Sequence, residues 1–327
     1  MKKILFLTVC LIPFFSYSQT LTAFRDSIKG GYNFWLYEPE NVDSSASNKP
    51  LVIFLHGRSL CGKNLNQVRR YGSINAVERG RKIDAFILAP QNPGESWKPS
   101  KILDILNWTK ERYAIDTTRV YVVGMSLGGY GTINFVGTYP EKVAAAMALC
   151  GGGHLSSYCG LTQVPLWIIH GTADRKVPVS QSKKVVNAME NCGNTSLLLF
   201  DQLKNVNHSQ LARFFYLPQT YEWLFAHSLT DSVRFVNRDY TVSPATLNEV
   251  YKYYDKTTDK ITVIDTGKDT RTATSKNYSG ARYYTVKKGD TLGAIAKKHR
   301  TSTSHLRKIN NIKEGGTLRV GQKMKVK

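Results

Sequence analysis

The chain of 327 residues is long enough for one large domain and a smaller one. Its 45 Lys and Arg residues against 24 Asp and Glu residues give a net charge of +21, and after the first residues no apolar run is long enough to span a membrane. Residues 281–327 alone carry thirteen basic residues against two acidic ones. Such a tail suits an anionic wall polymer, a lipid headgroup or a nucleic acid, and a solvated basic surface explains it equally well.

The N-terminus has the pattern of a secretory signal peptide. Lys2 and Lys3 precede an apolar run over residues 4–15, and small residues precede a plausible cleavage site before Gln19. A lipoprotein anchor at Cys10 is the weaker alternative, because no small residue stands before that cysteine. We therefore expect residues 1–18 to be removed and the mature protein to be secreted or periplasmic, without integral membrane association. A protein in that compartment rarely meets nucleic acid and the sequence shows no nucleic-acid motif, so no such partner is expected.

Four cysteines remain after the predicted signal peptide: Cys61, Cys150, Cys159 and Cys192. An even number in an oxidising compartment favours disulfides, and no Cys-x-x-Cys spacing suggests a metal site, so no metal is expected. Three pairings are open. Cys159 and Cys192 each precede an expected parallel strand, which places both at one end of a sheet and favours that pair.

From residue 20 to residue 227 the chain alternates apolar runs with segments of helical spacing. The strongest strand predictions are residues 51–55, 85–89, 120–123, 144–148, 166–170 and 196–200, and helices are expected over residues 102–113 and 180–191. Continuous apolar strands separated by helices predict a doubly wound, mostly parallel α/β sheet that is covered on both faces.

The expected strand 120–123 runs directly into the turn Gly124-Met125-Ser126-Leu127-Gly128, and a helix-like segment follows. A serine on so sharp a Gly-x-Ser-x-Gly turn takes a strained backbone and presents its hydroxyl at the carboxyl edge of the sheet. Short glycine patterns also recur by chance after strands. The partners that follow make Ser126 the expected nucleophile.

An elbow serine requires an acid and then a histidine later in the chain. Asp174 lies on the loop after the expected strand 166–170, where it serves either as this acid or as a turn cap. Of the seven histidines, His208 alone satisfies both the chain order and the loop position, so we expect it to be the base. His56 and His170 each close a strand, and we expect them to shape loops by hydrogen bonding.

The reaction also requires donors for an oxyanion. The backbone N–H of Leu127, next to the nucleophile, is the first expected donor, and that of Arg58, on the loop after strand 51–55, is the second. The Arg58 guanidinium either binds an anionic substrate group or is solvated. Trp97 follows another strand, where it either walls the acyl pocket or packs in the core.

The motifs at residues 55–57, 119–131 and 170–178, together with His208, resemble the α/β-hydrolase superfamily. Within it they are most similar to the secreted esterase, phospholipase/carboxylesterase and predicted-peptidase group. The resemblance implies hydrolysis of carboxylic esters through an acyl-enzyme without a cofactor. Asn207 departs from the pattern, because many relatives have glycine before the catalytic histidine. The motifs do not carry the identity of the acyl group or the alcohol.

Residues 228–282 form an expected extension and linker. Within them residues 255–280 are dominated by Thr, Asp, Lys and Ser. A segment of this composition cannot bury a core, so we interpret it as flexible.

The last part of the chain is compact again. Tyr284 and Val286 share one face of a short expected strand, Thr291 is placed to cap a helix, and a second helix and a closing strand follow. Residues 283–327 thus resemble the lysin motif, or LysM, in a β-α-α-β order. That family binds glycans containing N-acetylglucosamine, such as peptidoglycan and chitin.

The resemblance implies a sugar groove formed by five residues: Gly289, Asp290, Thr291, Leu292 and Ile312. Gly293 departs from the family, which usually has serine after Asp-Thr-Leu. The alternative is that Asp290 and Thr291 merely cap the helix and the module has lost its ligand.

These features predict a serine esterase held at a cell wall, or at another N-acetylglucosamine glycan, by its C-terminal module. Two alternatives stay open. The same triad can cleave amides, which would make the protein a serine peptidase. A catalytically silent glycan-binding protein is the third possibility, and the complete set of Ser126, Asp174 and His208 argues against it.

Overall fold

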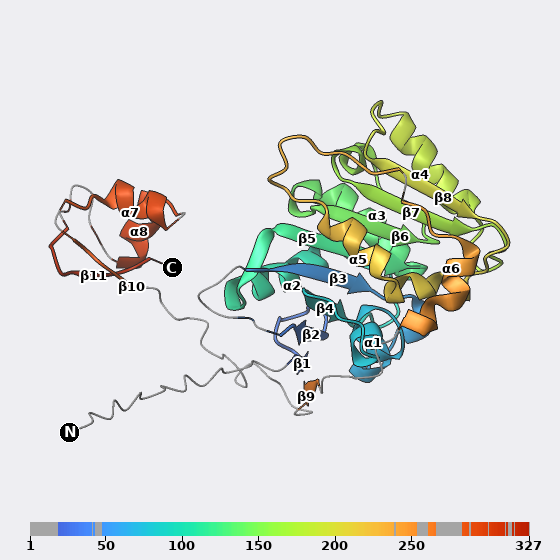
Figure 1. Cartoon of the computed structure of the whole chain (residues 1–327), viewed down its shortest axis with the longest axis horizontal. Coiled ribbons are helices and arrows are strands. Elements are labelled where there is room, and N and C mark those ends of the chain that lie inside the picture. The colour runs from blue at the N-terminus through green and yellow to red at the C-terminus, as the bar shows by residue number, and fades with distance from the viewer. Residues whose placement is uncertain are drawn as a thin grey trace, which may run out of the picture. The chain divides into compact units, whose positions relative to one another are not determined.

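The computed structural model describes residues 19–40, 42, 48–238, 240–253, 261–265, 283–287, 289–299, 301–310, 312, 316 and 318–326 (Figure 1). The predicted signal peptide lies outside the described residues. The chain divides into two compact units, Met1–Ala273 and Thr274–Lys327. No helix in the described part of the chain combines the length and apolar character that crossing a membrane requires.

The first unit is built on a nine-stranded sheet in the order β8-β7-β6-β5-β3-β4-β2-β1-β9. Neighbouring strands from β4 through β3 to β8 run parallel, whereas β2 pairs antiparallel with both β1 and β4. This confirms the predicted mostly parallel α/β fold, and the six predicted strands correspond to β3–β8. The strands are β1 (Thr20–Phe24), β2 (Phe34–Glu38), β3 (Lys49–Leu55), β4 (Phe86–Pro90), β5 (Ile115–Met125), β6 (Ala145–Leu149), β7 (Leu166–Gly171), β8 (Leu198–Leu203) and β9 (Thr262–Ile264).

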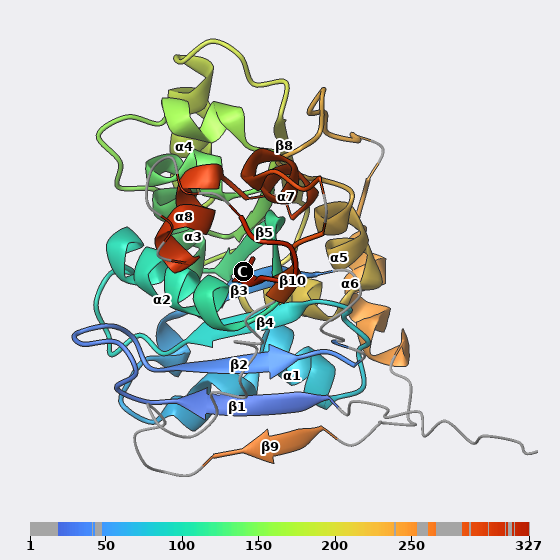
Figure 2. The same cartoon turned by 90° about the vertical axis from the view of Figure 1, so that its left-hand side faces the viewer.

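Helices cover both faces of this sheet (Figures 1 and 2). Along β3, Val52 and Phe54 pack with α1, α5 and α6, whereas Leu51 and Ile53 pack on the opposite face with α2, α3 and α4. Because both faces are buried, the strands are continuously apolar, which is the pattern visible in the sequence. The helices are α1 (Ser73–Glu78), α2 (Pro99–Arg112), α3 (Leu127–Thr138), α4 (Ser180–Glu190), α5 (Pro218–Phe225) and α6 (Pro244–Glu249).

The first compact unit continues beyond residue 227 into the predicted extension and linker. Val242 and Leu247 are buried in the same core cluster as α5. Further on, β9 lies inside the segment interpreted as a flexible linker, yet it pairs with the outer edge of β1, and Arg25 forms an ion pair with Asp265. The composition of this segment predicted only that it has no buried core, and Val263 of β9 is indeed exposed. An edge strand needs backbone partners rather than apolar side chains, so composition did not reveal it. Residues 255–260 and 266–280 of the predicted linker lie outside the described residues.

The second unit has the predicted β-α-α-β order: β10 (Tyr283–Thr285), α7 (Leu292–Lys298), α8 (Thr303–Asn310) and β11 (Lys323–Lys325). The strands β10 and β11 pair antiparallel. The buried core of this unit consists of Val286, Ile295, Ala296, Leu306, Met324 and Val326.

A disulfide joins Cys159 and Cys192, whose Cα atoms are 5.3 Å apart. It connects the 3-10 helix η4 (Cys159–Gln163), which precedes β7, to the turn after α4 that leads to β8. The favoured pairing is therefore confirmed. Cys61 and Cys150 are free thiols.

Candidate active site

The predicted strand–turn–helix is present at Ser126. The strand β5 ends at Met125, α3 begins at Leu127, and Ser126 between them has φ 58° and ψ −121°. A Cβ atom at Gly128 would lie 1.8 Å from the Leu55 carbonyl oxygen, and one at Gly124 would lie 2.2 Å from the Gly128 carbonyl oxygen. Only glycine fits these two positions, so the chain folds back tightly and holds Ser126 in a strained conformation at the sheet edge.

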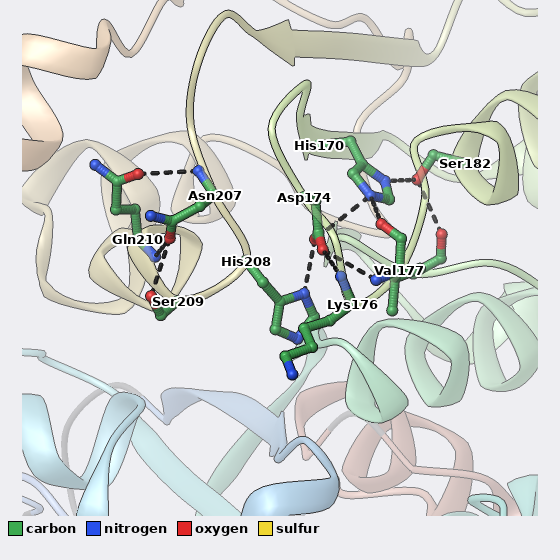
Figure 3. Close-up of polar contacts among 10 residues, drawn as sticks. His170, Asp174, Lys176, Val177, Ser182, Asn207, His208, Ser209 and Gln210 are labelled. Carbon is green, nitrogen blue, oxygen red and sulfur yellow. Dashed lines mark hydrogen bonds and ion pairs between the residues drawn. The ribbon is translucent and has the colours of Figure 1, made fainter.

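Asp174 and His208 form a hydrogen-bonded pair (Figure 3). The Asp174 side chain is fully buried on the loop after β7. Its Oδ1 accepts hydrogen bonds from the backbone N–H groups of Lys176 and Val177, at 2.8 and 2.9 Å. Its Oδ2 accepts one from His208 Nδ1 at 2.7 Å. These contacts fix the carboxylate, which in turn orients the imidazole and leaves Nε2 as the ring nitrogen available for proton transfer.

Ser126 and His208 line one cavity of about 700 Å³. The residues of the predicted triad follow β5, β7 and β8, and the carboxyl ends of parallel strands meet at one edge of a sheet. The His208 side chain is 21 % exposed, which gives a substrate access to its ring. The structure thus gathers all three residues at one place, an arrangement able to carry nucleophilic catalysis.

His56 and His170 shape loops, as predicted. His56 Nδ1 donates to the Gly57 carbonyl oxygen at 2.8 Å, and its Nε2 accepts from the Asn92 backbone N–H at 3.0 Å. His170 contacts Ser182 Oγ at 2.8 Å and the Val177 carbonyl oxygen at 2.9 Å. Burial lowers the pKa of His56 to about 4 and also lowers the pKa of His170, so both rings stay neutral and act structurally.

Two backbone donors are available for an oxyanion. Leu127 is the first residue of α3 and Arg58 the first of the 3-10 helix η1 (Arg58–Leu60), so neither N–H has an acceptor within its own helix. Neither has another hydrogen-bond partner among the described residues, and both residues line the cavity. The Gly57 N–H, by contrast, donates to the Tyr71 hydroxyl at 2.7 Å. The N-terminus of α3 adds the positive end of a helix dipole.

Of the two roles left open for Trp97, the structure supports core packing. The side chain is 3 % exposed, its Nε1 donates to the His56 carbonyl oxygen at 3.2 Å, and its ring packs edge-on against Tyr32. It is not among the residues that line the cavity. The wall is formed instead by apolar and aromatic side chains, among them Met125, Leu127, Tyr130, Val177 and Ala212.

Two residues near the site were not predicted from the sequence. Tyr71 lines the cavity and accepts the Gly57 N–H; nothing in its segment marks it as part of a motif. Cys150 follows β6 with φ 39° and is fully buried, and its sulfur lies within 4.8 Å of a carboxylate oxygen of Asp174. Burial raises the pKa of this thiol well above its usual range, so it stays protonated. Its place at the end of an expected parallel strand was the signal that could have identified it.

Cys150, Asp174 and His208 also place one potential metal-ligand atom each within 4.8 Å of one another, the only such group of three among the described residues. His208 Nδ1 already donates its proton to Asp174, so a cation here would have to displace the contact that orients the imidazole. The arrangement therefore fits acid–base chemistry better than metal binding.

The second unit uses some of the predicted groove residues for its own fold. Asp290 Oδ2 accepts hydrogen bonds from the Tyr284 hydroxyl and the Lys287 backbone N–H, at 2.7 and 2.8 Å. Thr291 Oγ1 caps α7 by accepting from the Ala294 N–H at 3.1 Å. Thr291 thus caps the helix, as the alternative without a ligand expected, whereas the contacts of Asp290 close the loop before α7 and do not cap the helix.

The other three predicted groove residues are Leu292, Ile312 and Gly289. Leu292 and Ile312 are half-buried against the core, and Gly289 is exposed with φ 91°. Contact of any of the five residues with a glycan stays a prediction.

Both units of the chain match families of known proteins. Residues 100–221 match the phospholipase/carboxylesterase family and residues 284–327 match the LysM domain. The chain carries an α/β-hydrolase domain and a LysM domain. The hydrolase domain resembles the crystal structure of a thermostable esterase, with 25 % identity and a TM-score of 0.54 over 64 % of this chain and 63 % of that one.

Two curated relatives of the hydrolase domain are fungal acetylxylan esterases. Acetylxylan esterase A of Talaromyces purpureogenus is 28 % identical over 165 residues, which cover 46 % of this chain and 41 % of the relative. A bifunctional acetylxylan esterase/xylanase of Neocallimastix patriciarum is 27 % identical over 166 residues, 48 % of this chain and 23 % of the relative. The chain thus spans less than half the length of either relative.

Proposed function

We propose that the hydrolase domain cleaves carboxylic esters through an acyl-enzyme on Ser126. The observation that carries the proposal is that His208, which is held by the buried Asp174 at 2.7 Å, lines the same cavity as a strained elbow serine. The similarity to acetylxylan esterases and to a thermostable esterase supports an ester as the substrate.

In the proposed reaction, Ser126 Oγ attacks the carbonyl carbon of the ester while its proton passes to His208 Nε2. Asp174 stabilises the imidazolium, and the N–H groups of Leu127 and Arg58 stabilise the oxyanion. The bond from the acyl carbon to the alcohol oxygen then breaks, and His208 returns the proton to that oxygen. Water repeats the sequence on the acyl-enzyme, which releases the carboxylic acid and restores Ser126.

The proposal also covers where the enzyme works. The LysM domain would hold it at peptidoglycan or another glycan that contains N-acetylglucosamine, outside the cytoplasm. The predicted signal peptide and the Cys159–Cys192 disulfide support an oxidising compartment. An acetyl or other acyl ester on a polysaccharide fits both domains.

The test compares wild type with Ser126→Ala on p-nitrophenyl esters from acetate to octanoate. We expect the substitution to lower kcat at least about 10³-fold, since the nucleophile is lost. Ser100→Ala, at an exposed serine of α2, is the matched control and should keep full activity. The chain-length profile of wild type measures the acyl pocket.

Two other results would contradict the proposal. Turnover of a peptide anilide without turnover of any ester would identify a peptidase. Absence of both activities, together with no fluorophosphonate labelling at Ser126, would leave a silent glycan-binding protein.

A further inference from the structure

A second hollow adjoins the catalytic cavity and has a different character. It has a volume of about 490 Å³ and shares Lys176, His208 and Ser209 with the first cavity. The walls of both are more apolar than polar, but the second is the less apolar of the two, and most of the residues that line it are polar or charged, including Arg175 and Asn207. The two compartments therefore meet at His208.

The chemistry of the proposed reaction assigns one half of the substrate to each compartment. His208 must return its proton to the oxygen of the leaving alcohol, so that oxygen has to come within hydrogen-bond distance of the ring. The alcohol half of the ester consequently lies on the His208 side of Ser126, where the second hollow begins. The acyl half is left to the apolar cavity.

The second hollow offers hydrogen-bond donors to a polar group. Asn207 Oδ1 accepts hydrogen bonds from Ser209 Oγ at 2.9 Å and from the Gln210 N–H at 3.1 Å. This fixes the carboxamide, and its Nδ2–H donors have no partner among the described residues. Donors held in this way suit the hydroxyl groups of a sugar.

The charged side chains of Arg and Lys that line the two compartments are not balanced by carboxylates. Arg175 and Lys176 line the second hollow and Arg58 lines the first. No ion pair joins any of the three side chains to a carboxylate among the described residues, and no Asp or Glu of that part of the chain lines either compartment. The nearby Asp174 is fully buried and already accepts three hydrogen bonds. Two uncompensated cations therefore stand where the alcohol must lie.

We propose that the second hollow binds the alcohol half of the substrate and that this alcohol is a sugar bearing a carboxylate, which Arg175 and Lys176 attract. The proposal rests on the ester hydrolysis proposed above. A uronic acid in an acidic polysaccharide carries such a carboxylate beside hydroxyl groups that can be esterified. A muramic acid in peptidoglycan does so where its stem peptide has been removed.

The test uses two substrates that differ in a single group: the mono-acetates of methyl β-D-glucopyranoside and of the corresponding methyl glucuronoside. Acetate release gives kcat/KM for each. We expect wild type to prefer the anionic ester about fivefold at low ionic strength, since exposed charge pairs are modest in strength, and to lose most of this preference in 0.5 M NaCl.

The variants locate the effect. Arg175→Gln and Lys176→Gln should each lower the ratio of the two kcat/KM values, and the double variant should bring it close to one. Lys183→Gln removes the same charge from an exposed position on α4, outside both hollows, and should keep the wild-type ratio. The ratio reports on charge recognition even where a variant lowers both rates.

A wild-type ratio of one, or a double variant with the full preference, would overturn this inference. Ser126-dependent hydrolysis of p-nitrophenyl acetate would then still support the proposed function. If wild type hydrolysed no ester, both proposals would fail together. Acetylated polygalacturonate and O-acetylated peptidoglycan glycan strands freed of stem peptides separate the two sources of the carboxylate: release from either supports the inference and identifies the source, whereas release from neither overturns it.

Discussion

The hydrolase domain and the LysM domain each hold a carboxylate on a loop, but they use it differently. Asp174 accepts two backbone N–H groups at one oxygen and keeps the other for His208, which lines a cavity. Asp290 accepts the Tyr284 hydroxyl and the Lys287 N–H at a single oxygen, and both contacts close its own loop. In the first domain the loop presents a side chain to a substrate, and in the second it stabilises the fold.

Domain size explains this difference. The hydrolase domain buries two large apolar clusters, one on each face of its sheet, whereas six residues form the buried core of the LysM domain within the described part of the chain. Small domains bury a smaller share of their surface and depend more on local contacts. The large core thus permits a strained serine and a buried carboxylate, whereas the small domain uses polar side chains such as Asp290 and Thr291 as structural contacts.

The largest expected effect comes from Asp174→Asn. The asparagine amide can donate where the carboxylate accepted, which stabilises the wrong tautomer of His208, so we expect kcat on p-nitrophenyl acetate to fall about 10³- to 10⁴-fold. Asp104→Asn, at an exposed position of α2, is the control and should retain activity. Wild-type turnover by a folded Asp174→Asn variant would show that this carboxylate does not orient the base.

The next largest effect tests whether the two domains act separately. Leu306 is fully buried in the LysM core, so Leu306→Ala should lower the free energy of unfolding of that domain by about 3 kcal/mol. The variant should then no longer sediment with insoluble peptidoglycan, while its hydrolysis of soluble p-nitrophenyl acetate stays at the wild-type rate. Val320→Ala, at a side chain that is 68 % exposed, should change neither quantity. A parallel loss of hydrolysis would mean that the catalytic domain depends on the LysM fold.

The smallest effect concerns acid stability of the hydrolase domain. Burial lowers the pKa of His56 from 6.5 to about 4, because removal from water disfavours the charged ring. The neutral ring accepts the Asn92 N–H at Nε2. Between pH 6.5 and pH 4, His56 is therefore protonated in the unfolded chain but neutral in the folded chain. The free energy of unfolding consequently falls as the pH falls towards 4. Between pH 7 and pH 5 this one group should remove about 2 kcal/mol from the free energy of unfolding.

Urea unfolding at several pH values measures this loss. His56→Gln should flatten the pH dependence even if it lowers stability throughout, and His154→Gln, at an exposed histidine, should leave the wild-type slope. An unchanged slope in His56→Gln would assign the acid sensitivity to other groups, such as the buried His227, whose pKa burial also lowers to about 4.

Much of the hydrolase fold could be predicted because its signals are local. Strands buried on both faces are continuously apolar, and the Gly-x-Ser-x-Gly turn is short enough to be visible in the sequence. Chain order and loop position then selected Asp174 and His208. The structure brings these two into contact because β7 and β8 are parallel neighbours whose carboxyl ends share an edge.

What the sequence by itself determined, then, is the set of elements and the residue types that carry chemistry, since both depend on neighbours along the chain. Tertiary structure alone decided that β9 pairs with β1, that Trp97 belongs to the core, and that the Cys150 thiol lies against Asp174. It also decided that Arg175 and Lys176 share a hollow with His208. Each of these contacts joins segments far apart in sequence, and their closeness depends on how the sheet is ordered and packed, which no local pattern records.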